Sequence, residues 1–275
     1  MKLLTVGSPE FTAFLASLKA RHGAMPVEVE QSARAILESI RTRGDAALFE
    51  QTERFDGVRL DASSVRVAPE EVRTASSALT PASVEALKIA ASRIRAFHLR
   101  QLRTSWFSEE DGAILGQLCR PLERVGVYVP GGRAAYPSTV LMNAIPAAIA
   151  GVPEIVMCTP ARHDGTIAPA VLAAADLAGV HTIFRVGGVQ AVGAMAYGTA
   201  SIPRVDKIVG PGNQYVAAAK RLVFGQVGID MIAGPTEVLI IADERARAAW
   251  AAADLLSQAE HDPLSSALLL TPSRK

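Results

Sequence analysis

From Glu123 onward, short β-branched runs alternate with alanine-rich stretches, and this alternation constrains the fold more than any other feature of the chain. The runs predicted as strands are Val125–Val129, Ile155–Cys158, Thr182–Val186, Lys207–Val209, Val238–Ala242 and Ala267–Thr271. The helices predicted between and after them lie near residues 138–150, 167–178, 189–197, 213–224 and 244–260. Neighbouring parallel strands need a crossover long enough to hold a helix. The sequence therefore predicts an α/β fold built on parallel strands.

The first hundred residues have helical patterns instead. Residues 10–21 repeat apolar side chains at helical spacing and are predicted to form an amphipathic N-terminal arm. A second helix is expected from Val29 and continues or restarts toward Leu48, and a third follows Pro81, a favourable first-turn residue. Asp56-Gly57 is predicted as a turn and Val65–Val67 as a short strand.

The last predicted strand is apolar and is followed only by Pro272–Lys275. Strands of parallel layers are covered by helices on both faces. This strand therefore predicts a following helix, and the pattern is that of a chain that stops inside an α/β layer.

Charge and apolar patterning argue against two classes of partner. The 275 residues include 28 basic and 27 acidic side chains, for a formal net charge of +1, whereas nucleic-acid binders usually carry a basic excess. The longest apolar stretch, residues 140–152, is interrupted by Asn143, Pro146 and Gly151 and falls short of the roughly 20 residues of a membrane span. We expect no nucleic-acid and no membrane partner.

The cysteine content and the N-terminus indicate a cytoplasmic protein. Cys119 and Cys158 make no disulfide framework, which is typical of a reducing compartment. The opening residues MKLLTVGSPEF are too short and too soon interrupted for a secretion signal.

Four glycine turns follow predicted strands, at Val129–Arg133, Arg185–Val189, Val209–Asn213 and Ala233–Thr236. Ligands of open α/β sheets bind outside the carboxyl ends of the strands, where helix N-termini also offer amide donors. Any one of these glycines could simply make a tight turn, but together they predict a ligand-binding rim. None of the turns is a GxGxxG fingerprint, so the spacing alone does not identify a dinucleotide.

Gln258 and His261 lie three residues apart at the end of the last predicted helix, so they share one face of it. Imidazole is a common zinc ligand, and an amide oxygen can join it in a catalytic site. The alternative is a histidine that interacts with the helix dipole. Two ligands do not complete a site, and the residues leave both interpretations open.

Several strings, in order along essentially the whole chain, resemble the histidinol dehydrogenase family. They are RGDAA at 43–47, RFDG at 54–57, RVGVYVPGGR at 124–133, GGVQA at 187–191, VGPGN at 209–213, IDMIAGPTEV at 229–238 and SQAEH at 257–261. The resemblance implies oxidation of L-histidinol through an aldehyde to L-histidine, in histidine biosynthesis, by a homodimer that uses NAD and zinc (Zn2+).

The resemblance also implies the architecture. We expect two Rossmann-like parallel-sheet domains, one inserted in the other, with residues 1–21 as a helical arm. Residues 22–126 plus 236–275 would form the first, interrupted and incomplete domain, and residues 127–235 the inserted nucleotide-binding-like domain.

Site residues follow from the same resemblance. Tyr128, Gln190 and Asn213 match NAD contacts, Thr236 matches a substrate contact, and Gln258 and His261 match both substrate contacts and zinc ligands. The general-base glutamate, its neighbouring histidine and two more zinc ligands are expected beyond the chain end, so no catalytic residue is assigned. Two alternatives remain to a partial or inactive histidinol dehydrogenase. One is a dehydrogenase of another small polar alcohol, and the other a non-catalytic fragment that binds nucleotide or dimerises.

Overall fold

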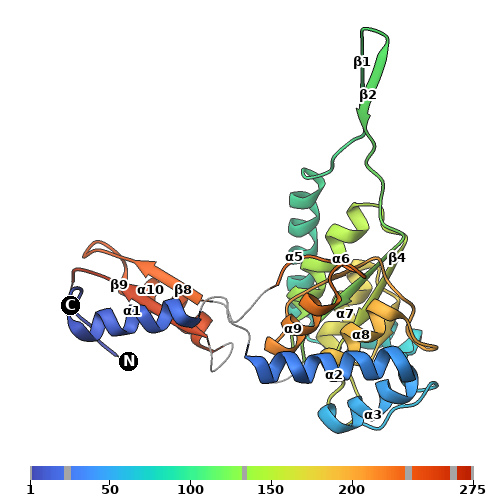
Figure 1. Ribbon diagram of the computed structural model, residues 1–275, viewed down its shortest axis with the longest axis horizontal. Helices are drawn as coiled ribbons and strands as arrows, with labels where there is room; N and C mark the ends of the chain where they lie inside the picture. The colour runs from blue at the N-terminus through green and yellow to red at the C-terminus, as the bar shows by residue number, and fades with distance from the viewer. Residues whose placement is uncertain (1, 22–25, 132–134, 233–236, 261–264, 274–275) are drawn as a thin grey trace.

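The computed structural model describes residues 2–21, 26–131, 135–232, 237–260 and 265–273. Most of the chain gathers around one five-stranded sheet, while a smaller layer near the C-terminus lies to one side of it (Figure 1). The predicted α/β class is confirmed.

The large sheet consists of parallel strands. In spatial order they are β5 (Thr182–Phe184), β4 (Glu154–Cys158), β3 (Arg124–Tyr128), β6 (Lys207–Val209) and β7 (Gly228–Ile229). Val125 stands opposite Ile155 on one side and Lys207 on the other, so β3 is central. The chain first builds outward from β3 through β4 to β5, then returns to place β6 on the other side of β3. This is the order of doubly wound nucleotide-binding sheets.

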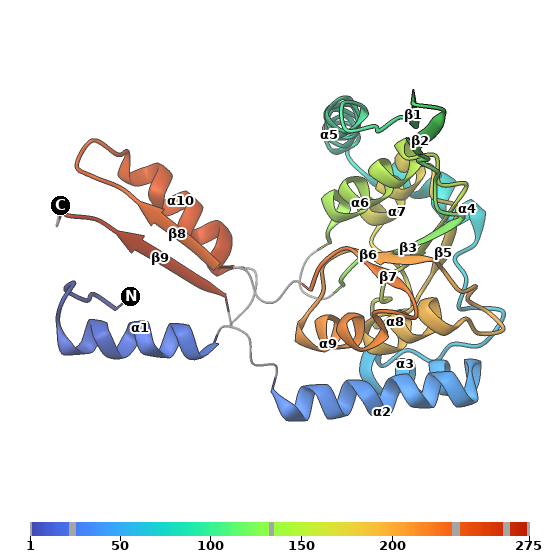
Figure 2. The ribbon, with the colours of Figure 1, turned by 45° about the horizontal axis from the view of Figure 1, so that its top comes forward.

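Helices cover both faces of this sheet (Figure 2). One face carries α4 (Pro69–Thr74), α5 (Pro81–Leu99), α6 (Pro137–Ile149) and α7 (Pro169–Ala178), with the 3₁₀ turn η1 (Ala75–Ala78). The other carries α8 (Gly188–Tyr197) and α9 (Gln214–Val223), which are covered in turn by α2 (Val27–Arg43) and α3 (Asp45–Asp56). Because both faces are buried, β3 and β4 are continuous apolar runs rather than alternating ones.

The predicted strands and long helices all form within a few residues of their expected bounds, but shorter elements were missed. The clearest omission is an antiparallel hairpin of β1 (Trp106–Glu110) and β2 (Ala113–Gln117). Its turn is Asp111-Gly112, with positive φ angles of 53° and 77°. A two-residue Asp-Gly turn between strands is a strong hairpin signal, which could have identified it from the sequence.

The segment 65–67 adds an antiparallel bridge to the outer edge of β5. Arg66 pairs with Phe184, the amide of Arg185 donates to the carbonyl of Val65 at 2.9 Å, and the amide of Val67 donates to that of Ile183 at 2.9 Å. The strand-like pairing predicted for Val65–Val67 is confirmed, and it ties the N-terminal helices to the edge of the sheet.

The smaller layer is a single β-α-β unit. β8 (Glu237–Ile241) pairs in parallel with β9 (Ser266–Leu270), and α10 (Ala248–Ala259) connects them. No described residue of α10 is buried. The N-terminal arm forms α1 (Pro9–Arg21), which lies beside this layer in both ribbon views (Figures 1 and 2). The domain boundaries expected at 22–126, 127–235 and 236–275 stay a prediction.

Among the described residues, no helix has the length and apolar character needed to cross a membrane. Both cysteines are free thiols: Cys158 is buried at the end of β4, and Cys119 is half-buried.

Candidate functional site

The point where the strand order reverses lies between β3 and β6, and open α/β sheets bind ligands at this point. The two strands end in Tyr128 and Val209, and Gly210 follows directly. Gly210 has a φ of 116°, and a Cβ on it would lie 2.1 Å from the carbonyl oxygen of Tyr128. Only glycine allows the turn after β6 to pass this close to β3.

An ion pair between a buried lysine and a partly exposed aspartate supports the same turn. Lys220 on α9 is 2% exposed and pairs with Asp230, which follows β7. Lys220 Nζ also donates to the carbonyl oxygen of Gly210 at 2.9 Å. Asp230 Oδ2 accepts from the Gly210 amide at 2.8 Å. Sequence patterns did not single out either residue. A lysine on the apolar face of a helix was the one available signal, since buried charges are normally paired.

Asn213 forms the N-cap of α9. Its Oδ1 accepts hydrogen bonds from the amides of Tyr215 at 3.0 Å and Val216 at 3.1 Å, which is the usual role of asparagine at this position. The residue itself is exposed. Its expected contact with NAD stays a prediction.

Tyr128 and Gln190 meet at the neighbouring glycine turn. The Tyr128 hydroxyl accepts a hydrogen bond from the amide of Gly188, the first residue of α8, at 3.1 Å. Gly188 has a φ of 62°, and a Cβ on it would lie 2.7 Å from Gln190 Oε1. Gln190 is 1% exposed. Within the described part of the chain, its Nε2 has no hydrogen-bond partner.

Burial is the main cause that raises the pKa of the Tyr128 phenol above its ordinary value, so the hydroxyl stays neutral near physiological pH. Burial likewise raises the pKa of the Cys158 thiol at the end of the adjacent strand. Both expected nucleotide residues, Tyr128 and Gln190, are therefore buried side chains that contact the turn at Gly188.

Asp56 approaches this turn from α3. Burial is the larger influence on its carboxyl and raises the pKa to about 6, against the opposing effect of a hydrogen bond from the backbone of Gly187. The sequence predicted only a turn at Asp56-Gly57. The turn is confirmed, since Gly57 ends α3 in the left-handed conformation with a φ of 69°.

Two cavities open beside the carboxyl ends of β3, β4 and β5. The first measures about 290 Å³ and is lined by Pro130, Gly131, Ala135, Thr159, Pro160, Ala161, Arg162, His163, Ile167, Ala168 and Val171. The second measures about 540 Å³ and lies between the segments 57–71 and 163–165, next to Arg185. His163 lines both cavities.

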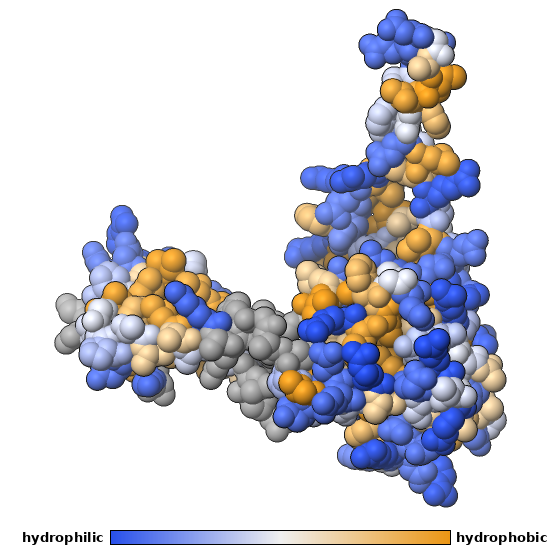
Figure 3. Space-filling model, viewed as in Figure 1, coloured by the Kyte–Doolittle hydropathy of each residue, from blue (hydrophilic) through white to orange (hydrophobic). Residues whose placement is uncertain are grey.

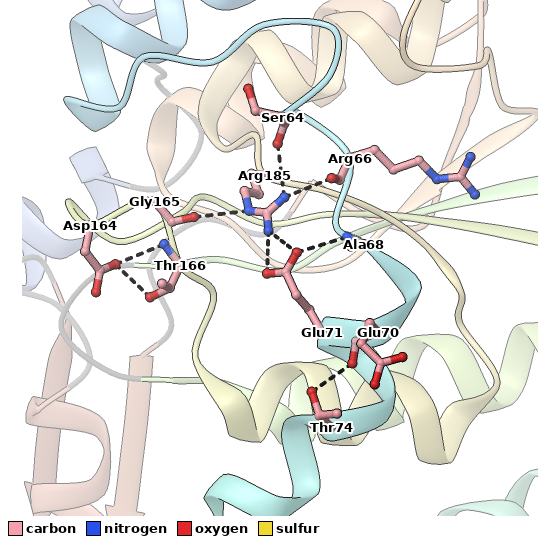
Figure 4. Close-up of polar contacts among 10 residues, drawn as sticks. All are labelled: Ser64, Arg66, Ala68, Glu70, Glu71, Thr74, Asp164, Gly165, Thr166 and Arg185. Carbon is pink, nitrogen blue, oxygen red and sulfur yellow. Dashed lines mark hydrogen bonds and ion pairs between the residues drawn. The ribbon is translucent and has the colours of Figure 1, made fainter.

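Arg185 lines the second cavity and forms hydrogen bonds to the segments on both sides of it (Figure 4). Its guanidinium donates to both carboxylate oxygens of Glu71, at 2.5 Å and 2.6 Å. It also donates to the carbonyl oxygens of Gly165, Ser64 and Arg66, at 3.1, 3.0 and 2.9 Å. The planar fork of arginine suits this many acceptors. Because its donors are taken by these contacts, we interpret Arg185 as a structural residue.

The expected substrate and metal residues lie in the C-terminal layer. Gln258 is half-buried in the last turn of α10, where its Nε2 donates to Ser265 Oγ at 3.3 Å. Thr236 and His261 fall outside the described residues. In the described ranges, no group of three or more His, Cys, Asp and Glu residues could hold a metal ion.

Comparisons with known proteins give a consistent result. A family model described as histidinol dehydrogenase matches residues 19–275. The histidinol dehydrogenase of Syntrophotalea carbinolica is 55% identical over 98% of this chain and 63% of its own length. That of Aquifex aeolicus is 57% identical over 94% of this chain and 59% of its own length.

A solved structure agrees with these relatives. The crystal structure of histidinol dehydrogenase from Elizabethkingia anophelis superposes with a TM-score of 0.83 at 43% identity, covering 90% of this chain and 57% of that one. The chain thus spans less than two thirds of the length of the relatives it matches. The family model, the identities and the shared fold together show that this chain belongs to the histidinol dehydrogenase family.

Proposed function

We propose that this chain carries the nucleotide-binding part of a cytoplasmic enzyme that oxidises L-histidinol through an aldehyde to L-histidine, with NAD as the hydride acceptor. The family membership supports the reaction. The observation that carries the nucleotide site is the meeting of Tyr128 and Gln190 at the glycine turn that begins α8. This turn stands at the ligand-binding edge of a doubly wound sheet.

The residues present fit a dinucleotide. Gln190 Nε2 is a buried donor without a partner among the described residues, and the Gln190 side chain lies directly beside Gly188, the first residue of α8. Asn213 fixes the N-terminus of α9, and the amides at helix N-termini favour phosphate groups. When bound, NAD would supply the redox chemistry. The protein would orient it through Tyr128, Gln190 and Asn213 and exclude water from the turn.

The described residues do not make a zinc site on their own. Gln258 is the one described member of the expected pair, and its Nε2 donates to Ser265. The proposal that Gln258 and His261 bind zinc and substrate, with Thr236 as a further substrate contact, therefore rests on the family. It requires ligands beyond this pair, because catalytic zinc usually has three protein ligands.

A homodimer is part of the same proposal. The hairpin β1–β2 has no buried residue and exposes Phe107, Ile114 and Leu115 by 63–71%. Figure 3 shows apolar surface on this hairpin and on the C-terminal layer. Large exposed apolar patches often mark protein interfaces. The mass of the protein in solution tests this. A wild type with twice the chain mass, together with a Phe107→Ser, Leu115→Ser double variant with the mass of one chain, would support a second copy covering the hairpin.

The function is tested by titrating the purified chain with NAD in a calorimeter and by following L-histidinol-dependent NADH formation with zinc added. We expect NAD binding that weakens in Gln190→Ala but not in Gln117→Ala, since Gln117 lies on the exposed hairpin. Turnover with L-histidinol, and less with other small polar alcohols, would support the full proposal. NAD binding without turnover would favour the non-catalytic alternative. A folded chain that binds no NAD would contradict the nucleotide site.

A further inference from the structure

Pro160 lies between two of the glycine turns. It follows β4, the strand between β3 and β5, by two residues. A Cβ added to Gly131, after β3, would lie 2.3 Å from Cγ of the proline. A Cβ added to Gly187, the N-cap of α8, would lie 2.6 Å from the proline Cβ. Both distances are shorter than van der Waals contact, so the backbones of both glycines pack directly on the proline ring.

Backbone conformation does not require glycine at these two positions. Gly187 has a φ of −111°, which is open to any residue. Gly131 also lies outside the left-handed region, in contrast to Gly188 and Gly210. For both Gly131 and Gly187, the three atoms nearest to an added Cβ all belong to Pro160. The steric demand for glycine therefore comes from the proline.

Strand pairing fixes the segment before Pro160. The amide of Val129 donates to the carbonyl oxygen of Cys158 at 2.9 Å. The amide of Thr159 donates to the carbonyl oxygen of Phe184 at 3.1 Å. Pairing with both neighbouring strands thus continues to the end of β4 and the residue after it, and the proline has no amide hydrogen with which to extend it.

A closed turn fixes the segment after Pro160. The amide of Arg162 donates to the carbonyl oxygen of Thr166 at 2.8 Å, and the amide of Gly165 donates to that of Arg162 at 2.8 Å. Arg185 Nε donates to the carbonyl oxygen of Gly165 at 3.1 Å. The proline is therefore held on both sides along the chain, and its ring has little freedom to move away from the two glycines.

Both glycines are close in sequence to residues assigned to NAD. Gly131 follows Tyr128 by three residues, and Gly187 precedes Gly188. The Gly188 amide donates to the Tyr128 hydroxyl at 3.1 Å, and the buried Gln190 side chain lies beside Gly188. The separation between the two turns therefore determines whether the Tyr128 hydroxyl reaches the Gly188 amide.

We propose that Pro160 is a positioning residue of the nucleotide site, whose ring sets the separation between the turn after β3 and the N-terminus of α8. The proposal rests on the proposed function, because both turns are assigned to NAD. It requires no contact between the proline and NAD. A turn that is already held in place binds its ligand more tightly, because it need not be ordered on binding.

The first test is a double-mutant cycle on thermal unfolding. Gly131→Ala should lower Tm by roughly 5 °C, the effect of overpacking in a chain of this size. Pro160→Ala removes the ring atoms at 2.3 and 3.2 Å and leaves Cβ at 3.5 Å, an ordinary van der Waals distance. The double variant should therefore be no less stable than Pro160→Ala alone.

Gly187→Ala is the matched comparison for this cycle. Its new Cβ would meet the proline Cβ at 2.6 Å, and alanine at position 160 keeps that atom. Pro160→Ala should thus leave the loss in Gly187→Ala nearly unchanged, whereas Pro160→Gly should remove most of it. Equal rescue of both glycine variants by Pro160→Ala, or rescue of neither, would overturn the proposal.

The second test measures NAD affinity by calorimetry at a temperature at which every variant is folded. Pro160→Ala should bind NAD about fivefold more weakly, because the loosened turns must be ordered on binding. The Gly131→Ala, Pro160→Ala double variant should regain most of this loss, because the new methyl group restores contact between the two segments. A double variant that recovers Tm but not affinity would show that Pro160 serves packing alone.

Two variants control for lost stability and for the loss of a proline. Ile155→Val, at the other end of β4, should lower Tm without changing NAD affinity. Pro121→Ala removes a proline that lies 3.6 Å from a Cβ added to Gly151, near the amino ends of β3 and β4. It should also leave the affinity unchanged.

The outcomes separate this inference from the proposed function. Unchanged affinity in Pro160→Ala would overturn the positioning role, and so would an equal loss of affinity in Ile155→Val. If the wild type binds no NAD, the proposed function fails, while the cycle still decides whether Pro160 sets the separation of the two turns.

Discussion

Lys220 Nζ lies 2.9 Å from the carbonyl oxygen of Gly210 and donates a hydrogen bond to it. The contact joins the second turn of α9 to the first residue after β6, at the point where the strand order reverses. Asp230 completes the arrangement by pairing with the lysine and accepting from the Gly210 amide. One ion pair thus binds both backbone polar groups of a single glycine.

Removing this lysine should be costly. We expect Lys220→Ala to lower the free energy of unfolding by about 1–3 kcal/mol, because it leaves the Gly210 carbonyl oxygen without its buried donor and the partly exposed Asp230 carboxylate without its cation. Chemical denaturation with urea measures the change. Arg245→Ala breaks an exposed pair with Asp243 and should change stability by less than about 1 kcal/mol. Equal effects of the two substitutions would show that Lys220 does not hold the Gly210 carbonyl in solution.

Alanine substitutions at two glycines with positive φ distinguish the cost of backbone strain from the cost of steric overlap. In Gly210→Ala the new Cβ would overlap the Tyr128 carbonyl oxygen, whereas at Gly225, with a φ of 96°, no atom lies within 4 Å. Gly225→Ala should cost about 1–2 kcal/mol, the penalty of the left-handed conformation. Gly210→Ala should cost at least about 2 kcal/mol more, because the strand backbone must move. Thermal unfolding of both variants measures the difference between their stabilities. Equal stabilities would show that the turn after β6 relaxes to accommodate the new Cβ.

The Tyr128 hydroxyl can be removed without changing the ring. Tyr128→Phe leaves the Gly188 amide without its acceptor and should destabilise the chain by about 1–3 kcal/mol. Tyr215→Phe, at an exposed tyrosine, should fall within about 0.5 kcal/mol of the wild type. Urea unfolding of both variants supplies the comparison. A stable Tyr128→Phe variant would mean that the Gly188 amide finds another partner.

Asp56 should make stability depend on pH in an unusual direction. Its folded pKa of about 6 exceeds the ordinary value of 3.8, so the native state keeps a proton that the unfolded chain has released. The contribution of Asp56 is therefore most favourable below pH 4 and is lost as pH rises through 6. Asp56→Asn should stabilise the chain at pH 7.5 by on the order of 1–2 kcal/mol, with partial exposure taken into account.

Asp61 provides the opposite case. Hydrogen bonds from Ser63 and Ser64 lower its pKa to about 2, in an exposed loop. Its favourable contribution is present above pH 3.8 and is lost as the pH falls toward 2. Asp61→Asn should therefore weaken the fold at neutral pH, whereas Asp56→Asn strengthens it. Unfolding curves of the two variants across the pH range test these signs, and the same sign in both would contradict the assigned environments.

We expect substitutions of Arg185 that remove its planar guanidinium group to destabilise the fold. Arg185→Lys keeps the charge but cannot reach Glu71 and the three carbonyl oxygens together, so we expect a loss of about 3 kcal/mol or more. Arg59→Lys, in an exposed pair with Glu53, should change stability by less than about 1 kcal/mol. Limited proteolysis between residues 57 and 71 would reveal whether that segment detaches from β5 in Arg185→Lys.

Some features of this protein could be predicted from the sequence because they depend on neighbouring residues. Val125–Val129 and Ile155–Cys158 are apolar, β-branched runs separated by a helical stretch, and that pattern by itself indicates parallel strands. The turn signals are equally local: Asp111-Gly112 indicates its hairpin, although it was missed. The family strings also lie within short segments, so the expected positions of Tyr128, Gln190 and Asn213 needed no structure.

Only the tertiary structure decided which of these segments meet. Tyr128 and Gly188 are 60 residues apart, and Arg185 and Glu71 are 114 apart. Asp56 is a simple turn residue in the sequence, and its pKa is raised by the burial that the folded chain imposes on it. Local periodicity reports which face of an element is buried. Desolvation, ion pairing and the order of the strands depend on what covers that face, and no local pattern contains that information.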